Sequence, residues 1–121
     1  HAAGAPERGR SALDGVEAMN FMANLMREHV PQDARIHYII TRGGDAPNVV
    51  PESAEVFYYV RHRNPLIMSE IFDRIVKTSE AAAVGTGTSV NHEVIHGAYS
   101  LLPNDALASV VDDHLRWSAR Q

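Results

Sequence analysis

Apolar residues recur at helical intervals in two long stretches of the chain. Between residues 11 and 30 they follow a capping arrangement of Ser11 and Asp14, and Pro31 ends the pattern. A second stripe begins after Asn64 and a proline at the first helical position. Its members are four residues apart, as one face of a helix requires: Ile67, Ile71 and Ile75. The sequence therefore predicts two amphipathic helices, each of which needs a sheet face to cover.

Three stretches have the composition of strands. Residues 35–41 and 54–61 are rich in β-branched and aromatic side chains, and the segment Gly43–Asn48 between them has turn composition. Two strands joined in this way are expected to pair as antiparallel neighbours. Residues 88–102 again show β-branched residues in alternation, so we expect a third strand there.

A last helix is predicted after Pro103 and Asn104, over residues 104–121. Its expected buried stripe consists of Leu107, Val110, Val111, His114 and Leu115. Helices that cover one face of an antiparallel sheet give an α+β fold, here a two-layer sandwich. The 121 residues fit one ordinary domain, so we expect residues 1–121 to form a single unit.

Charge and composition exclude several classes of function. The net charge of −4 gives no basic footprint for nucleic acid, so no nucleic-acid partner is expected. No apolar run approaches the ~18 residues of a membrane span, so no membrane partner is expected. The chain has no Cys, which removes disulfide and thiolate chemistry and suits a cytoplasmic protein.

One stretch, His92-Glu93-Val94-Ile95-His96, fits the pattern H-E-x-x-H. On a helix this pattern places two imidazoles on one face as zinc ligands, with Glu as general base. Gly97 follows at once and β-branched residues precede the motif, which favours a strand. On a strand the two histidines lie roughly 13 Å apart, too far for two Zn–N bonds of about 2 Å. We therefore expect no metal site in this chain.

Three motifs in order resemble the lid-and-dimerisation domain of the aminoacylase and glutamate carboxypeptidase family of zinc-dependent amidohydrolases. The stretch His1–Asp14, HAAGAPERGRSALD, is similar to the lid entry H-A-x-x-P-x-x-G-x-x-A. Gly43–Pro51, GGDAPNVVP, resembles the loop G-x-x-x-N-x-x-P, and a strand ending in Arg61 follows. The closing Leu101–Asn104 resembles the return to the catalytic domain in the aminobenzoyl-glutamate hydrolase branch, so the resemblance spans nearly the whole chain.

This resemblance implies a fold and a partner. The family domain is a ferredoxin-like sheet with two helices on one face, and two such domains pair edge to edge in a homodimer. The family has a strand before the position that matches His1, so here either that strand is absent or the fragment is cut short.

The resemblance also implies a function. Family members hydrolyse an amide with two zinc ions held by a separate catalytic domain, whose H-x-D and Glu-Glu motifs are missing here, so this chain alone is expected to be inactive. The residue matching His1 reaches into the partner subunit's active site and stabilises the oxyanion. Those matching Asn48 and Arg61 hold the carboxylate of a small-molecule substrate, an amide of an acidic amino acid such as aminobenzoyl-glutamate. His62 and Arg63 are close enough in sequence to share the role of Arg61.

Two alternatives remain at this level. The chain could be a stand-alone ferredoxin-like interaction or ligand-binding module without an enzymatic parent. It could also be a small H-E-x-x-H zinc protease, which requires a helix over residues 92–96.

Overall fold

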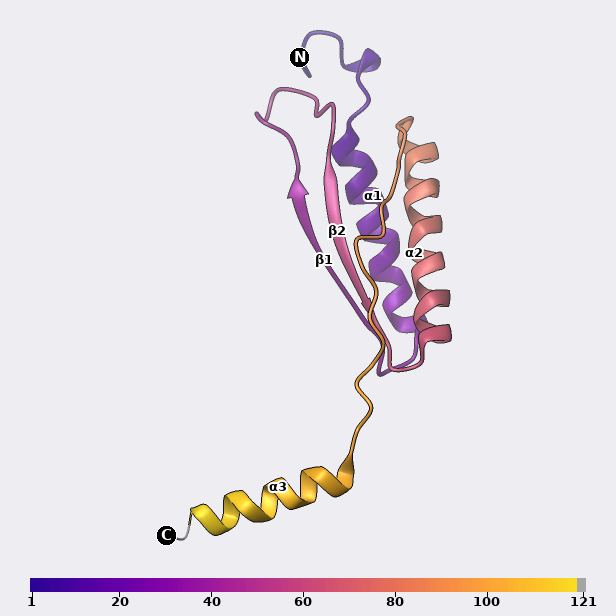
Figure 1. Ribbon diagram of the computed structural model, residues 1–121. Helices are drawn as coiled ribbons and strands as arrows, with labels where there is room; N and C mark the ends of the chain where they lie inside the picture. Colours follow the sequence, from indigo (N-terminus) through magenta and orange to yellow (C-terminus); the bar gives the residue numbers. More distant parts are fainter. Residues whose placement is uncertain (120–121) are drawn as a thin grey trace.

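The computed structural model describes residues 1–119 of the chain. Two helices and two strands form its body, and a third helix follows after an extended segment (Figure 1). The elements are the short 3-10 helix η1 (Pro6–Arg8), α1 (Ala12–Leu25) with its continuation η2 (Met26–His29), β1 (Arg35–Arg42), β2 (Glu55–Arg61), α2 (Pro65–Thr86) and α3 (Asp105–Ser118).

Side-chain caps set the ends of the body helices. Ser11 Oγ accepts the backbone N–H of Asp14 at the start of α1, at 3.4 Å. Asn64 Oδ1 accepts the N–H of Leu66 at the start of α2, at 2.9 Å. Gly87 ends α2 in the left-handed region, with φ +67°. Both predicted helices are therefore confirmed.

The two central strands pair as predicted. β1 and β2 are antiparallel, with Tyr38 opposite Tyr58 and Arg35 opposite Arg61. An irregularity in the register falls between Ile40 and Arg42, next to the loop that joins the strands. The Tyr38 and Tyr58 rings lie 5.1 Å apart between centroids, which adds a cross-strand aromatic pair to the ladder.

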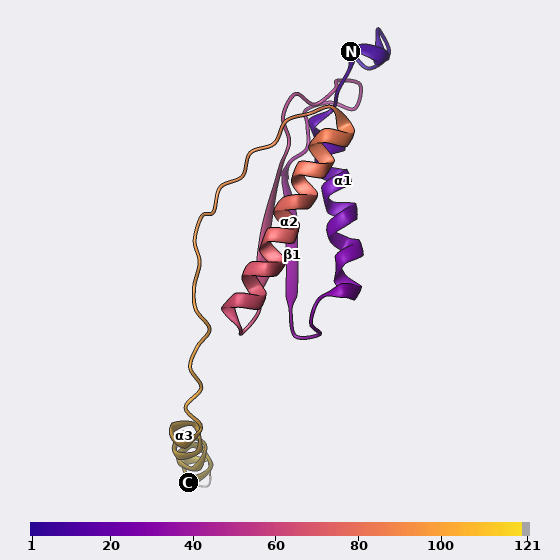
Figure 2. The same ribbon diagram turned by 90° about the vertical axis from the view of Figure 1, so that its right-hand side faces the viewer.

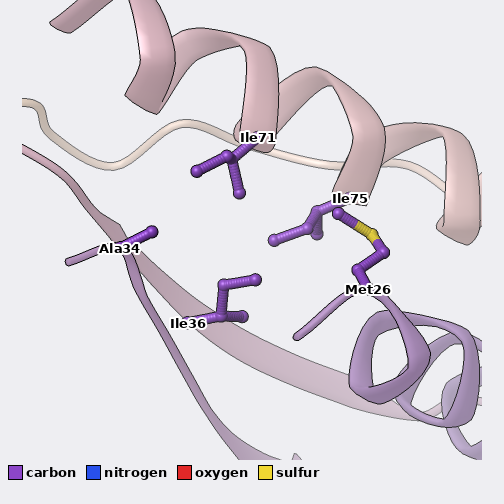
Figure 3. Close-up of a cluster of buried hydrophobic side chains, with 5 residues drawn as sticks. All are labelled: Met26, Ala34, Ile36, Ile71 and Ile75. Atoms are coloured by element: carbon purple, nitrogen blue, oxygen red, sulfur yellow. The ribbon is translucent and has the colours of Figure 1, made fainter. Parts of the chain in front are cut away.

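Helices α1 and α2 lie side by side on one face of this sheet (Figure 1). The buried cluster between the layers draws on all parts of the body: Met26, Ala34, Ile36, Ile71 and Ile75 (Figure 3). These isoleucines are each 3% exposed, so the helical spacing of four and the strand alternation both place side chains in the core as expected. The result is the predicted two-layer α+β arrangement.

The predicted third strand over residues 88–102 is wrong. This segment is extended, but within residues 1–119 no backbone hydrogen bond joins it to β2, and a strand needs such a ladder. Side chains bridge the distance instead: His92 lies 6.4 Å from Phe72 and His96 lies 6.4 Å from Tyr59, measured between ring centroids. The segment is not helical either, so the two histidines do not share a helix face.

The predicted buried stripe of the last helix is also wrong for this chain. The helix itself is present, with Asn104 Oδ1 accepting the Leu107 N–H at 3.0 Å. However, none of its described residues is buried, and Leu107 and Leu115 are 59% and 64% exposed. The reason is that α3 lies apart from the body (Figures 1 and 2), so no element of this chain covers its apolar side.

Candidate functional site

His1 and Asn48 meet at the end of the sheet where β1 stops and β2 starts. The Nδ2 atom of Asn48 lies 3.1 Å from Nε2 of His1. The backbone reinforces this contact, because the N–H of Ala2 donates to the carbonyl of Asn48 at 3.0 Å. Two of the three sequence-predicted site residues are therefore adjacent, although 47 positions separate them.

The hydrogen bonds of His1 fix which ring nitrogen carries the proton. Nδ1 accepts the N–H of Ala3 at 3.2 Å, so in the neutral ring Nε2 is the protonated nitrogen. An N–H on Nε2 needs an acceptor, and Asn48 provides one when its amide is turned so that the oxygen faces the ring. Asn48 thus orients His1 with an exposed Nε2–H donor beside it.

The loop that carries Asn48 is tied to the start of α1. The Pro51 carbonyl accepts the N–H of Ala12 at 3.0 Å, and the Ala46 carbonyl accepts the N–H of Val49 at 3.1 Å. Gly44 has φ +125°, and a Cβ added there would meet Pro51 Cγ at 2.9 Å, so both the backbone conformation and the space require glycine. The predicted role of this glycine in backbone conformation agrees with that geometry.

Arg61 lies at the opposite end of β2. Its guanidinium carbon is 5.3 Å from the centre of the Tyr59 ring, and the residue is exposed. The six residue steps from Glu55 to Arg61 span about 20 Å at ~3.3 Å per step, so Arg61 does not meet His1 or Asn48 within one chain.

His62 and Arg63 are engaged elsewhere, by Asp33. The Asp33 carboxylate accepts from His62 Nε2 at 2.9 Å and pairs with Arg63 Nε at 3.2 Å. His62 Nδ1 in turn accepts the backbone N–H of Asn64 at 2.9 Å. The hydrogen bond from His62, assisted by the charge of Arg63, lowers the pKa of Asp33 below its usual 3.8. This leaves Arg61 as the arginine at this end without a carboxylate partner among the described residues.

Sequence reasoning missed Asp33 and Tyr59, which hold these three residues in place. Asp33 follows the helix-ending Pro31 and looked like an ordinary loop residue. Tyr59 alternates with Arg61 on one face of β2, and this spacing of two was the signal that could have found it.

The described residues gather no metal site. No three His, Asp or Glu side chains come together in residues 1–119. Nor does any helix in that range reach the length and apolarity that crossing a bilayer needs.

Beside the second edge of β2 lies an open groove of about 1260 Å³. Its walls are β2, the exposed side of α2 and the extended segment after α2, with Tyr59, Phe72, His92 and His96 among its lining residues. The groove separates β2 from that segment, which accounts for the missing ladder between them.

Comparison with known proteins gives a consistent set of matches. The family model described as the peptidase dimerisation domain matches residues 1–87. The chain is 42% identical over 112 residues to a p-aminobenzoyl-glutamate hydrolase of Escherichia coli (strain K12), which covers 92% of this chain and 23% of that protein. It is 30% identical over 115 residues to Xaa-Arg dipeptidase of Mus musculus, covering 94% and 27%.

A third similar protein is indole-3-acetyl-aspartic acid hydrolase of Enterobacter agglomerans, 28% identical over 104 residues, with 86% of this chain and 24% of that protein covered. The chain spans about a quarter of the length of these relatives.

Proposed function

This chain belongs to the peptidase dimerisation domain family, and from that premise we propose that it is the dimerisation and substrate-lid domain of a metal-dependent amidohydrolase. The observation that carries the proposal is the His1–Asn48 pair, a donor held in place by an amide at the exposed end of a dimerisation domain. The parent protein then hydrolyses an amide, and this domain lends side chains to its active site. The absence of Cys is in keeping with a cytoplasmic enzyme.

The substrate class follows from what the relatives' names share. The names contain glutamate, arginine and aspartate, amino acids that differ in side-chain charge. All three carry a carboxylate next to the amide or peptide nitrogen, so a carboxylate clamp serves each of them. We propose a small amide of an acidic amino acid, aminobenzoyl-glutamate or a close analogue, because the relative with 42% identity acts on that type of compound by name.

In this proposal His1 stabilises the oxyanion. The Nε2–H donor exchanges Asn48 for the oxygen of the scissile carbonyl as that carbon becomes tetrahedral. Because a donor aimed at the developing charge acts mainly in the transition state, its loss lowers kcat more than it raises KM.

Arg61 binds the substrate carboxylate in the same proposal. Its planar guanidinium is suited to a bidentate pair, and stacking on Tyr59 orients it while leaving its N–H groups available. Since Arg61 and the His1–Asn48 pair lie at opposite ends of β2, we propose that one chain supplies them to two different active sites of a homodimer.

The metal ions belong outside this chain. Two zinc ions in a separate catalytic domain supply the polarising charge and the activated water when bound. This chain's own contribution is to bind the carboxylate, to orient a donor and to close over the site. We therefore expect residues 1–121 alone to show no hydrolysis.

A complementation experiment in the full-length parent tests this arrangement. His1→Ala and Arg61→Ala each lower kcat/KM by about 100-fold or more, with the loss in kcat for His1 and in KM for Arg61. When the two inactive variants are mixed and allowed to exchange subunits, roughly a quarter of the activity returns, because half of the dimers are mixed and each has one intact site.

Two exposed residues away from these positions provide matched controls. His29→Ala and Lys77→Ala remove the same kinds of side chain and are expected to leave kcat/KM within about twofold of wild type. No recovery of activity on mixing would mean that His1 and Arg61 serve the same site or none.

The alternatives make different predictions. A stand-alone binding module has no hydrolytic parent, which the coding sequence flanking this domain reveals directly. An H-E-x-x-H protease binds one zinc per chain, so metal analysis after desalting of residues 1–121 separates it from the proposed lid domain.

A further inference from the structure

The outward side of α1 exposes two large apolar side chains. Phe21 and Leu25 are 67% and 59% exposed and lie four residues apart, so they form one patch on the helix surface. The opposite side of α1 is buried in the body through Val16 and Ala23. Such a pair on the water side of an otherwise amphipathic helix calls for a covering surface.

This patch borders β1. Asn24, which lies between Phe21 and Leu25 in sequence, donates through Nδ2 to the Tyr38 hydroxyl at 3.3 Å. One turn later Arg27 donates through Nη1 to the Ile36 carbonyl at 2.6 Å. The same flank of the molecule therefore presents the α1 patch and, below it, the strand β1.

β1 has an open edge on that flank. In the described part of the chain its one strand partner is β2, so the backbone groups along its other side have no ladder. The second edge of β2 is different, because the extended segment after α2 runs past it across the groove. Figure 2 shows this segment along one flank of the body and α1 along the other.

We propose that the open edge of β1 together with Phe21 and Leu25 is the surface through which a second copy of this chain binds. This inference rests on the proposed function, which requires a homodimer, and adds the surface to it. Antiparallel pairing of a strand with its own copy obeys a two-fold axis, so β1 is its own suitable partner. The two sheets then become one four-stranded sheet, and the α1 helices cover each other's apolar patches.

The patch gives the pairing its apolar contribution, which edge hydrogen bonds alone do not supply. Stable interfaces bury on the order of 1,200–2,000 Å² in total, with large apolar side chains near the centre. Four such side chains, two from each copy, meet beside the shared strands. The exposed apolar stripe of α3 is a competing surface, and the experiment below distinguishes it.

The first test compares surface variants of the chain by light scattering and sedimentation over a concentration series. The double variant Phe21→Glu, Leu25→Glu is expected to raise the dimer dissociation constant at least about 100-fold. The matched control is Leu66→Glu, Val84→Glu on α2, where the side chains are 75% and 85% exposed and lie outside the proposed surface. Circular dichroism establishes that each variant keeps its helices.

The outcomes separate the two ideas. A wild-type dimer that the α1 changes leave intact overturns the surface but not dimerisation, and sensitivity to Leu115→Glu would assign the contact to α3 instead. A wild-type chain that is monomeric at every concentration overturns both the surface and the homodimer.

Cysteine cross-linking provides a second measurement that does not depend on loss of folding. The chain has no Cys, so single variants report without background. Ile39→Cys and Ile40→Cys sit in the middle of β1, and the one next to the two-fold axis is expected to form a disulfide-linked dimer. Val90→Cys, 47% exposed on the segment beside the groove, is expected to stay monomeric. Cross-linking at Val90 with none on β1 would place the interface at the other flank.

Discussion

The hydrogen bond between Tyr58 and Asn20 joins β2 to α1 inside the body. The Tyr58 hydroxyl donates to Oδ1 of Asn20 at 2.6 Å, and Asn20 is 5% exposed. Burial and the neighbouring Tyr38 raise the pKa of Tyr58, so the hydroxyl keeps its proton. Tyr58→Phe removes this donor and leaves a buried amide oxygen without it. Because an unsatisfied buried acceptor costs about 1–3 kcal/mol, we expect a destabilisation of about 2 kcal/mol.

Tyr59→Phe is the matched control for this substitution. Tyr59 is the next residue of the same strand, points to the opposite face and is 43% exposed. Its change is expected to stay within about 0.5 kcal/mol of wild type. In urea unfolding followed by circular dichroism, a loss of ~2 kcal/mol lowers the midpoint by about 1 M at a slope near 2 kcal/mol/M. Equal midpoints for the two variants would refute the reasoning that this buried bond anchors β2 to α1.

Three further outcomes are expected. Ile71→Ala in the core, where the side chain is 3% exposed, destabilises by about 3 kcal/mol through the cavity it leaves, as urea unfolding will measure. Because the pKa of Asp33 is lowered, the stability from its bond to His62 is present above pH 3.8 and is lost as the pH falls below that value. The unfolding midpoints of wild type and Asp33→Asn therefore converge on acidification, whereas a constant difference would contradict this origin. Asn104→Ala removes the cap of α3 and costs that helix about 1 kcal/mol, but the body's unfolding midpoint is unchanged because α3 buries nothing against it.

Local rules were sufficient for the elements of the body. The caps at Ser11 and Asn64 are side-chain hydrogen bonds to residues two or three positions away, so their effect is readable from short stretches. Ile71 and Ile75 are buried because helical spacing puts them on one face. The antiparallel pairing of β1 and β2 follows from a single connecting loop.

Alternation does not say whether a strand has a partner, and this is why residues 88–102 were assigned incorrectly. The composition favours an extended backbone, and the backbone is extended. A ladder also needs a second strand within hydrogen-bonding distance, and the groove beside β2 keeps the segment away. The apolar stripe of α3 failed in the same way, since a helix can be amphipathic without the chain supplying a surface to cover it.

The candidate site divides along the same line. The sequence by itself determined which side chains are available, namely an imidazole, an amide and a guanidinium in family order, and it determined the helices and strands that carry them. Tertiary structure decided which of these groups meet: the loop after β1 returns to His1 and brings Asn48 against its ring, while the length of β2 carries Arg61 to the far end of the sheet. Side-chain identity and local conformation depend on neighbours a few residues away, whereas the distance between two groups depends on how the whole chain is laid out in space.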